Sequence, residues 1–330
     1  MYENYYRNEM QKIMDRRVRE LNDSLKQQHC NFCQDNRYQS VMSYLRTQPS
    51  KAYFNGNIVQ LGQFVFLITQ APTNIPAFYK EIFDFRANSI IQLTKFVEEM
   101  APKAERYVPL SEGESAEFYS ESVEAQYISD ALKALKQKST TKQIFLTKEQ
   151  IQTQKQQPKD SFVWHRKTLD FAQEKLQIQA GNFKKIGDDF YQIPLQIQFS
   201  VQQEFFKNFN QKLECDYFYY GKWFDFQKST EAQIFELCQT CLGVKSDKIV
   251  IHCSAGIGRS ATYAICLYIF KCFQNGDLKD EKEAWKRLPI SIYESVEILR
   301  TQRNPMCVQT VEQFLFLFEF ADYCSKQFTK

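Results

Sequence analysis

A segment near the middle of the second half of the chain combines the residue types that thiol-based phosphoryl transfer needs. It reads His252-Cys253-Ser254-Ala255-Gly256-Ile257-Gly258-Arg259-Ser260. The apolar residues 248–252 predict a strand before it, and residues 259–272 predict a helix after it. A loop in this position points backbone N–H groups at one spot, where the helix dipole adds partial positive charge. Because its glycines permit unusual dihedrals, we expect the loop Cys253–Arg259, hereafter the signature loop, to cradle a phosphate dianion.

Cys253 and Arg259 are the side chains of this loop that could act on a phosphoryl group. The guanidinium of Arg259 is planar and can bind two phosphate oxygens at once. The helix N-terminus and Arg259 both favour the thiolate form of Cys253, which is the nucleophilic form. We therefore expect in-line attack on phosphorus and a phosphocysteine intermediate, with Ser260 donating a hydrogen bond to the departing thiolate. A buried structural cysteine is the alternative, and the Cys-x5-Arg-Ser spacing between strand and helix disfavours it.

The composition is that of an ordinary globular chain. Its 330 residues, of which 43% are hydrophobic, suffice for one large domain or two small ones. A net charge of +3 gives no reason to expect nucleic acid or a membrane surface as a partner. No signal peptide and no apolar stretch long enough to span a bilayer is visible. We therefore expect the ten cysteines to be free thiols in a reducing, cytoplasmic compartment.

Strand and helix patterns are mixed along the chain. Strand patterns occur at 58–68, 90–96, 190–197, 217–220 and 248–252. Helix patterns occur at 76–85, 231–242, 259–272, 280–288, 295–303 and 310–324. This mixture predicts an α/β (α+β) fold, one domain over 1–330 with a highly twisted central mixed sheet flanked by helices. Residues 1–29 are expected to form an N-terminal helical segment, and the Gln/Lys-rich residues 133–185 an insertion, either an extended hairpin or a disordered loop.

The signature loop resembles that of the protein tyrosine phosphatase family, and the resemblance covers most of the chain. Five further segments are similar to motifs of that family and follow its order: Asn36-Arg37-Tyr38 (the recognition loop), Tyr53–Ile58, Thr69–Pro72, Trp223-Phe224-Asp225 (the Trp-Pro-Asp mobile loop) and Val308–Gln313 (the glutamine loop). The resemblance implies a tyrosine-specific phosphatase that acts on phosphotyrosine-containing proteins or peptides. It also implies that no metal or organic cofactor takes part.

The resemblance implies roles in the chemical steps for four further side chains. Asp225 is expected to protonate the leaving tyrosyl oxygen and then to deprotonate the attacking water. Trp223 would anchor the loop that carries Asp225 and closes over the substrate. Gln309 is expected to position the hydrolytic water, with support from Gln313.

Substrate selection and support are expected from another group of residues. Tyr38 would line a deep slot that phosphotyrosine can fill and phosphoserine cannot. Glu98 would pair with Arg259 and fix its orientation, and Lys103 would lie near the general acid. His252 is expected to orient the signature loop.

Two departures from the family pattern bear on function. Ser40 stands where the family usually has an aspartate that grips the substrate backbone, and Phe224 replaces the proline of the mobile loop. These departures leave open a catalytically inactive phosphotyrosine-binding module, although the nucleophile, the arginine and the aspartate are all present. A phosphoinositide phosphatase is disfavoured because the signature loop carries no lysine, and a dual-specificity enzyme is disfavoured by Tyr38.

Two Cys-x-x-Cys pairs raise the question of a zinc site. Cys30/Cys33 and Cys238/Cys241 could together supply four ligands. Cys238 and Cys241 fall on an apolar helix face, where cysteine packs as a small hydrophobic residue. We therefore expect no metal site.

Overall fold

A computed structural model of the chain describes residues 35–50, 53–110, 114–120, 144–146, 163–164, 172–203, 209–226, 228–243, 248–276 and 284–329. These residues fall into two compact units. The first unit comprises the described residues of 35–105, 187–191 and 218–329, and the second those of 106–186 and 192–217. The predicted helical segment 1–29 lies outside the described residues, and its helix stays a prediction.

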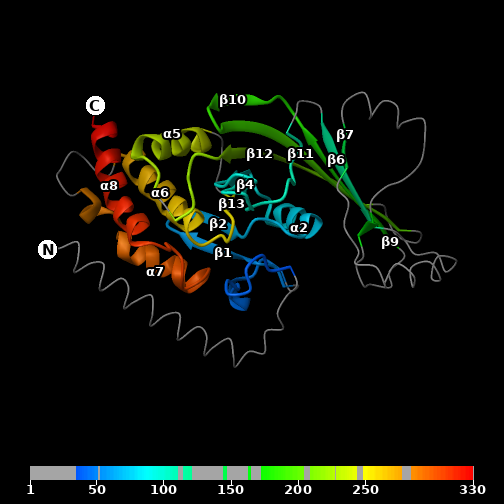
Figure 1. Ribbon diagram of the computed structural model, residues 1–330, viewed down its shortest axis with the longest axis horizontal. Coiled ribbons are helices and arrows are strands. Elements are labelled where there is room, and N and C mark those ends of the chain that lie inside the picture. Colours follow the sequence, from blue (N-terminus) through cyan, green and yellow to red (C-terminus); the bar gives the residue numbers. More distant parts are fainter. Residues whose placement is uncertain are drawn as a thin grey trace. The chain divides into compact units, whose positions relative to one another are not determined.

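The first unit is built on a mixed sheet with the strand order β1-β2-β13-β3 followed by the end of β12 (Figure 1). The strands are β1 (Gly56–Leu61), β2 (Phe64–Thr69), β13 (Lys248–His252), β3 (Ser89–Gln92) and β12 (Phe209–Tyr220). β13 runs parallel to β2 and β3, whereas β1 is antiparallel to β2. His252 pairs with both Thr69 and Gln92, so three parallel strands end side by side. The loops that follow them therefore emerge at the same edge of the sheet.

Helices flank this sheet, which confirms the predicted fold class. They are α2 (Ile75–Phe85), α5 (Glu231–Leu242), α6 (Arg259–Gln274), α7 (Ile292–Gln302) and α8 (Val311–Phe328), with the short 3-10 helices η1 (Leu45–Thr47) and η3 (Ala284–Arg287). Helix α6 contacts β2 and β13 and is surrounded by α5, α7 and α8 (Figure 1). It is apolar on nearly all sides, as expected of a helix in a core. No helix in the described ranges is long and apolar enough to cross a bilayer.

The helix N-termini differ in how their free N–H groups are satisfied. The side chains of Asn74, Thr230, Ser291 and Thr310 accept hydrogen bonds from the first turns of α2, α5, α7 and α8. Helix α6 instead begins after Gly258, which offers no side-chain cap. The first-turn N–H groups of α6 are therefore left for a group bound in the signature loop.

The second unit contains residues 192–203 of β11 and 209–217 of β12 in a sheet of order β12-β11-β9-β6-β7, in which β9 is antiparallel to β11 and β6, and β6 is antiparallel to β7. Besides β12, the strands are β6 (Ser115–Ser120), β7 (Ile144–Leu146), β9 (Ala172–Ala180) and β11 (Phe190–Gln203), with β8 (Val163–Trp164) beside β6 and β10 (Lys184–Gly187) beside β11. β9 pairs with both β11 and β6. The described parts of the predicted insertion 133–185 thus contain strands, and the single domain over 1–330 stays a prediction.

Candidate active site

The signature loop turns sharply between β13 and α6 and holds the thiol of Cys253 inside the turn. Cys253 is only 3% exposed, and its Sγ accepts a hydrogen bond from the N–H of Gly256 at 3.3 Å. Gly256 has a φ of +71°, and a Cβ atom there would lie 2.1 Å from the carbonyl oxygen of Thr69. Both the backbone conformation and the available space therefore require glycine. The N–H of Ala71 donates to the carbonyl oxygen of Ser254 at 2.9 Å, which ties the loop to the chain after β2.

Arg303, the residue that follows α7, binds the backbone of this loop. Its side chain is fully buried and donates to the carbonyl oxygens of Gly256 (3.2 Å) and Ala255 (3.3 Å). The same guanidinium donates to the side-chain oxygens of Asn55 (2.8 Å) and Asn57 (3.0 Å). The carbonyl groups of the loop are therefore turned toward Arg303, and its N–H groups remain for an anion. No role for Arg303 was predicted, because the sequence carries no signal that joins it to residues so far away in the chain.

The side chain of Arg259 is the main cation beside Cys253. Its Nη1 donates to Glu98 Oε1 at 2.7 Å and to the carbonyl oxygen of Trp223 at 2.8 Å. Its Nη2 lies 3.1 Å from Asp225 Oδ1. Burial opposes the charged guanidinium, but the charges at Cys253, Glu98 and Asp225 outweigh it and raise the pKa of Arg259. The arginine therefore stays charged and is fixed in one orientation by a contact with Glu98 that the family resemblance implied.

Glu98 comes from the small hairpin of β4 (Val97–Glu98) and β5 (Ala101–Pro102). Its side chain is 5% exposed, and Oε1 also accepts hydrogen bonds from Thr94 Oγ1 (2.8 Å) and from the N–H of Lys95 (3.1 Å). The tip residues Glu99 and Met100 both have positive φ, as a two-residue hairpin turn of this kind demands. The hairpin thus delivers a buried carboxylate whose position is set by three donors.

Asp225 lies in the loop 221–226, hereafter the Trp-Phe-Asp loop, between two cations. Its Oδ2 is 2.7 Å from the ammonium of Lys103, and its Oδ1 faces Arg259. The hydrogen bond to Asp225 raises the pKa of Lys103. The ring of Trp223 is fully buried and packs edge-on against Phe316 of α8, with 6.1 Å between centroids. Trp223 therefore anchors the loop, and the carboxylate of Asp225 points at the arginine of the signature loop.

Tyr38 and Ser254 connect the recognition loop to the signature loop. The hydroxyl of Tyr38 lies 2.9 Å from Ser254 Oγ, which itself donates to the carbonyl oxygen of Lys103 at 2.9 Å. Asn36 accepts hydrogen bonds from Tyr53 (3.0 Å) and Asn55 (2.9 Å) and so fixes the recognition loop. Tyr38 therefore borders the opening of the anion cradle.

His252 precedes the nucleophile at the end of β13 and is fully buried. Its Nδ1 lies 3.0 Å from the carbonyl oxygen of Cys253, and its ring meets Phe78 edge-on at 6.0 Å. Burial lowers its pKa to about 4, and the nearby charges of Arg37 and Arg259 act in the same direction. The imidazole is therefore neutral at physiological pH and helps to fix the backbone of Cys253.

The glutamine loop packs against the signature loop on the side of Gly258. The N–H of Val308 donates to the carbonyl oxygen of Ile257 at 3.0 Å. A Cβ atom on Gly258 would lie 3.1 Å from Gln309 Oε1 and 3.2 Å from Gln313 Nε2, so both amides reach the edge of the cradle. The backbone N–H of Gln309 donates to Gln313 Oε1 at 3.0 Å, which ties the side chain of Gln313 to the backbone of the glutamine loop.

Ser260 lies in the first turn of α6, directly after the arginine of the signature loop. Its side chain is fully buried. Its hydroxyl has no hydrogen-bond partner in the part of the chain that the structure describes. The hydroxyl is therefore available to a group in the signature loop.

Comparison with known proteins agrees with this geometry. The model of the protein-tyrosine phosphatase family matches two overlapping segments, residues 26–183 and 164–322. The chain belongs to the protein-tyrosine phosphatase family. The matched segments contain every residue of this family's motifs that the sequence analysis assigned to the site.

By sequence, individual relatives match a shorter part of the chain. Tyrosine-protein phosphatase 1 of Saccharomyces cerevisiae is 33% identical over 116 residues, which make up 32% of this chain and 34% of the relative. The chain thus matches about a third of the length of this phosphatase. A structure of PTPN18, from work on its fingerprint on HER2 tyrosine phosphorylation sites, is similar with a TM-score of 0.60 at 16% identity. The match covers 98% of this chain and 95% of the PTPN18 chain. A structure of PTPN18 in complex with HER2 phosphopeptides has a TM-score of 0.56 at 15% identity. That match covers 94% of this chain and 91% of the PTPN18 chain. These two likenesses show the fold of the family's phosphatase domain.

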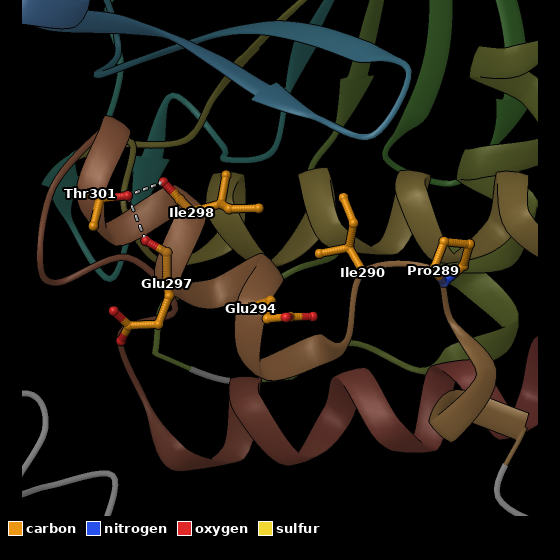
Figure 2. Close-up of a pocket in the computed structure, with 6 residues that line it drawn as sticks. All are labelled: Pro289, Ile290, Glu294, Glu297, Ile298 and Thr301. Carbon is orange, nitrogen blue, oxygen red and sulfur yellow. Dashed lines mark hydrogen bonds between the residues drawn. The ribbon is translucent and has the colours of Figure 1, made fainter.

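A pocket elsewhere on the first unit lies beside α7 (Figure 2) and is lined by Pro289, Ile290, Glu294, Glu297, Ile298 and Thr301. The hydroxyl of Thr301 donates to the carbonyl oxygens of Glu297 (2.8 Å) and Ile298 (3.1 Å), as Figure 2 shows. None of the lining residues belongs to the phosphatase motifs. We therefore assign this pocket no part in the chemistry.

Only one of the two Cys-x-x-Cys pairs, Cys238/Cys241, lies within the residues that the structure describes. Cys238 and Cys241 are buried in α5, and burial raises the pKa of Cys238 well above its ordinary value. Cys30 and Cys33 lie outside the described residues. Over the ranges that the structure describes, no group of three or more His, Cys, Asp or Glu side chains could hold a metal ion.

Proposed function

We propose that the chain hydrolyses phosphotyrosine in proteins or peptides through a phosphocysteine intermediate. The observation that carries this proposal is the set of contacts made by Arg259. This one guanidinium lies against the buried carboxylate of Glu98, the carbonyl of Trp223 and the carboxylate of Asp225, at the N-terminus of the helix that follows Cys253. A phosphate held there would meet a nucleophile on one side and a proton donor on the other.

In the first step, the thiolate of Cys253 attacks phosphorus while the bond to the tyrosyl oxygen breaks. The N–H groups of the signature loop and the guanidinium of Arg259 stabilise the negative charge on the equatorial oxygens. Asp225 gives its proton to the departing phenolate, which leaves as tyrosine. The phosphoryl group remains on Cys253.

In the second step, water attacks the phosphocysteine and the S–P bond breaks. Asp225, now a carboxylate, accepts a proton from this water, and Gln309 positions the water with support from Gln313. The hydroxyl of Ser260 donates a hydrogen bond to the thiolate as it departs. Inorganic phosphate leaves, and both Cys253 and Asp225 return to their starting protonation states.

Tyrosine selectivity is proposed to come from the depth of the cradle below Tyr38. A phosphotyrosine side chain extends past Tyr38 to the thiolate, whereas phosphoserine is shorter by an aromatic ring. The likeness to PTPN18 in complex with HER2 phosphopeptides supports a phosphotyrosine peptide as the substrate class.

A direct test compares matched phosphotyrosine and phosphoserine peptides with the full chain. We expect phosphate release from the phosphotyrosine peptide alone, and none with Cys253→Ser. Equal rates on both peptides would contradict tyrosine selectivity. Binding of the phosphotyrosine peptide without any turnover would instead support the inactive binding module that Ser40 and Phe224 leave open.

A further inference from the structure

Phe224 occupies the middle of the Trp-Phe-Asp loop, between the buried anchor Trp223 and Asp225. Its ring is 54% exposed, so packing in a core does not hold it. The ammonium of Lys95 lies 5.9 Å from the centroid of this ring, within the range of a cation–π interaction. Phenylalanine does not restrict its own backbone as proline does, so contacts of the side chain must help to hold this part of the loop.

Lys95 is itself fixed at both ends. Its N–H donates to Glu98 Oε1 at 3.1 Å, and the same oxygen accepts the hydrogen bond from Arg259. Its ammonium lies 2.8 Å from Asp189 Oδ2 in an ion pair. The backbone of Lys95 is therefore tied to the group that orients the phosphate-binding arginine, and its side chain reaches the loop of the general acid.

Asp189 belongs to the turn between β10 and β11 and contacts the same loop through its backbone. Its carbonyl oxygen accepts a hydrogen bond from the N–H of Gly221, where the Trp-Phe-Asp loop begins. A Cβ atom on Gly221 would lie 2.7 Å from the hydroxyl of Tyr219, so the start of the loop is closely packed. The ring of Tyr219 stacks on Tyr191 (4.5 Å) and on Phe96 (5.9 Å), the neighbour of Lys95.

We propose that Lys95 is a positioning residue for the general acid. Together with Asp189 and Phe224 it forms a contact set, hereafter the Lys95 bridge, that holds the Trp-Phe-Asp loop where Asp225 meets Arg259. The bridge extends from Asp189, whose carbonyl oxygen binds Gly221 at the start of the loop, to Phe224, the residue before Asp225. This inference rests on the proposed function, because it assigns Asp225 the proton transfer to the leaving group.

The expected effect is modest because all three side chains of the bridge are partly exposed. Removing an exposed cation–π contact together with an exposed ion pair should lower the equilibrium constant for the positioned loop by about 3- to 10-fold. The effect should be confined to steps that need the proton of Asp225. The rate of attack on an aryl phosphate should be nearly unchanged when its phenol is acidic enough to leave without a proton.

The test measures kcat/KM of Lys95→Met on two substrates, a phosphotyrosine peptide and 2,4-dinitrophenyl phosphate. We expect about a 3- to 10-fold loss on the peptide and less than about a 2-fold loss on the activated ester. Lys80→Met is the matched control, because Lys80 is similarly exposed and pairs with Asp84 on α2. Equal losses on both substrates, or no loss beyond that of Lys80→Met, would overturn the proposal.

Phe224→Leu provides a second route to the same answer if Lys95→Met folds poorly. It removes the aromatic face, keeps an apolar side chain and leaves the ion pair of Lys95 with Asp189, so it should reproduce the cation–π part of the loss on the peptide. The double variant Lys95→Met/Phe224→Leu should lose no more than Lys95→Met alone, and additive losses would overturn the bridge. Asp225→Asn separates this proposal from the proposed function. A large loss on the peptide with Asp225→Asn supports the proposed function, whatever the Lys95 variants do.

Discussion

The guanidinium of Arg259 and the carboxylate of Glu98 form an ion pair at 2.7 Å whose side chains are only 1% and 5% exposed. A buried pair of this kind adds little net stability, but removal of one partner leaves the other charge without compensation. Glu98 also receives hydrogen bonds from Thr94 and Lys95, so its position is set before any substrate arrives. The orientation of Arg259, the proposed phosphate ligand, is thus built into the fold.

Glu98→Gln should therefore lower both stability and activity. We expect the free energy of unfolding to fall by about 3 kcal/mol, since Arg259 loses its buried anionic partner. Inhibition by vanadate, a phosphate analogue, should weaken in parallel with kcat/KM. Asp84→Asn is the control: it breaks an exposed pair with Lys80 and should cost about 0.5 kcal/mol or less. Urea denaturation and vanadate titration check both expectations, and equal costs for the two variants would contradict them.

Gly256→Ala should abolish activity because its Cβ atom would press on the backbone of Thr69. Gly276 offers a matched control, since its φ of +80° is similar but no atom lies within 4 Å of a Cβ there. Gly276→Ala should cost about 1 kcal/mol of stability from the left-handed backbone and leave kcat unchanged. Stability and turnover of the two variants separate backbone strain from steric collision. Normal turnover in Gly256→Ala would show that the loop does not need this glycine.

Arg303→Lys should disturb the signature loop even though the charge is kept. A lysine cannot bind both loop carbonyls and both asparagines, so buried oxygen atoms lose their donors. We expect a loss of at least about 2 kcal/mol in stability and a lower kcat. Arg46→Lys, which changes an exposed arginine bonded to the carbonyl of Thr301, should alter neither quantity measurably. An active, fully stable Arg303→Lys variant would argue against the support assigned to Arg303.

His252 should make the fold sensitive to acid. Its pKa falls from 6.5 to about 4 on folding, so between these values the unfolded chain binds a proton that the folded chain does not. Stability therefore rises with pH across this window, and acidification from pH 7 to pH 4 should remove about 3 kcal/mol through this residue alone. Urea denaturation at several pH values should show a shallower dependence for His252→Asn. An unchanged dependence would mean that His252 does not stay neutral in the fold.

The sequence predicted the local elements of the site well, because short-range patterns determine them. The strand over 248–252 and the helix over 231–242 agree with β13 and α5 residue for residue. Where a turn interrupts a pattern, prediction was less successful. The predicted strand over 58–68 is in fact the two strands β1 and β2, which meet at a turn containing Gly62 with a φ of +58°. The described part of the predicted helix 280–288 is the 3-10 helix Ala284–Arg287.

Contacts between distant segments could not be predicted from the residues themselves. The resemblance to the family's motifs indicated the pairing of Glu98 with Arg259, and the structure places them together. The contacts of Arg303 and of Lys95 are equally long-range but carry no local signature. A buried arginine and an exposed one look alike in a sequence, since only the fold decides which oxygens surround them.

The nucleophilic role of Cys253 is tested most directly by trapping the covalent intermediate. The variant Gln309→Ala should slow the second step, so mixing it with a phosphotyrosine peptide and quenching in alkaline denaturant should preserve phosphocysteine. Mass spectrometry of the digested protein should then find one phosphoryl group on the peptide that contains Cys253, formed as fast as tyrosine is released. Continued turnover with no phosphoryl group on Cys253, or with the group on another residue, would contradict the proposed mechanism.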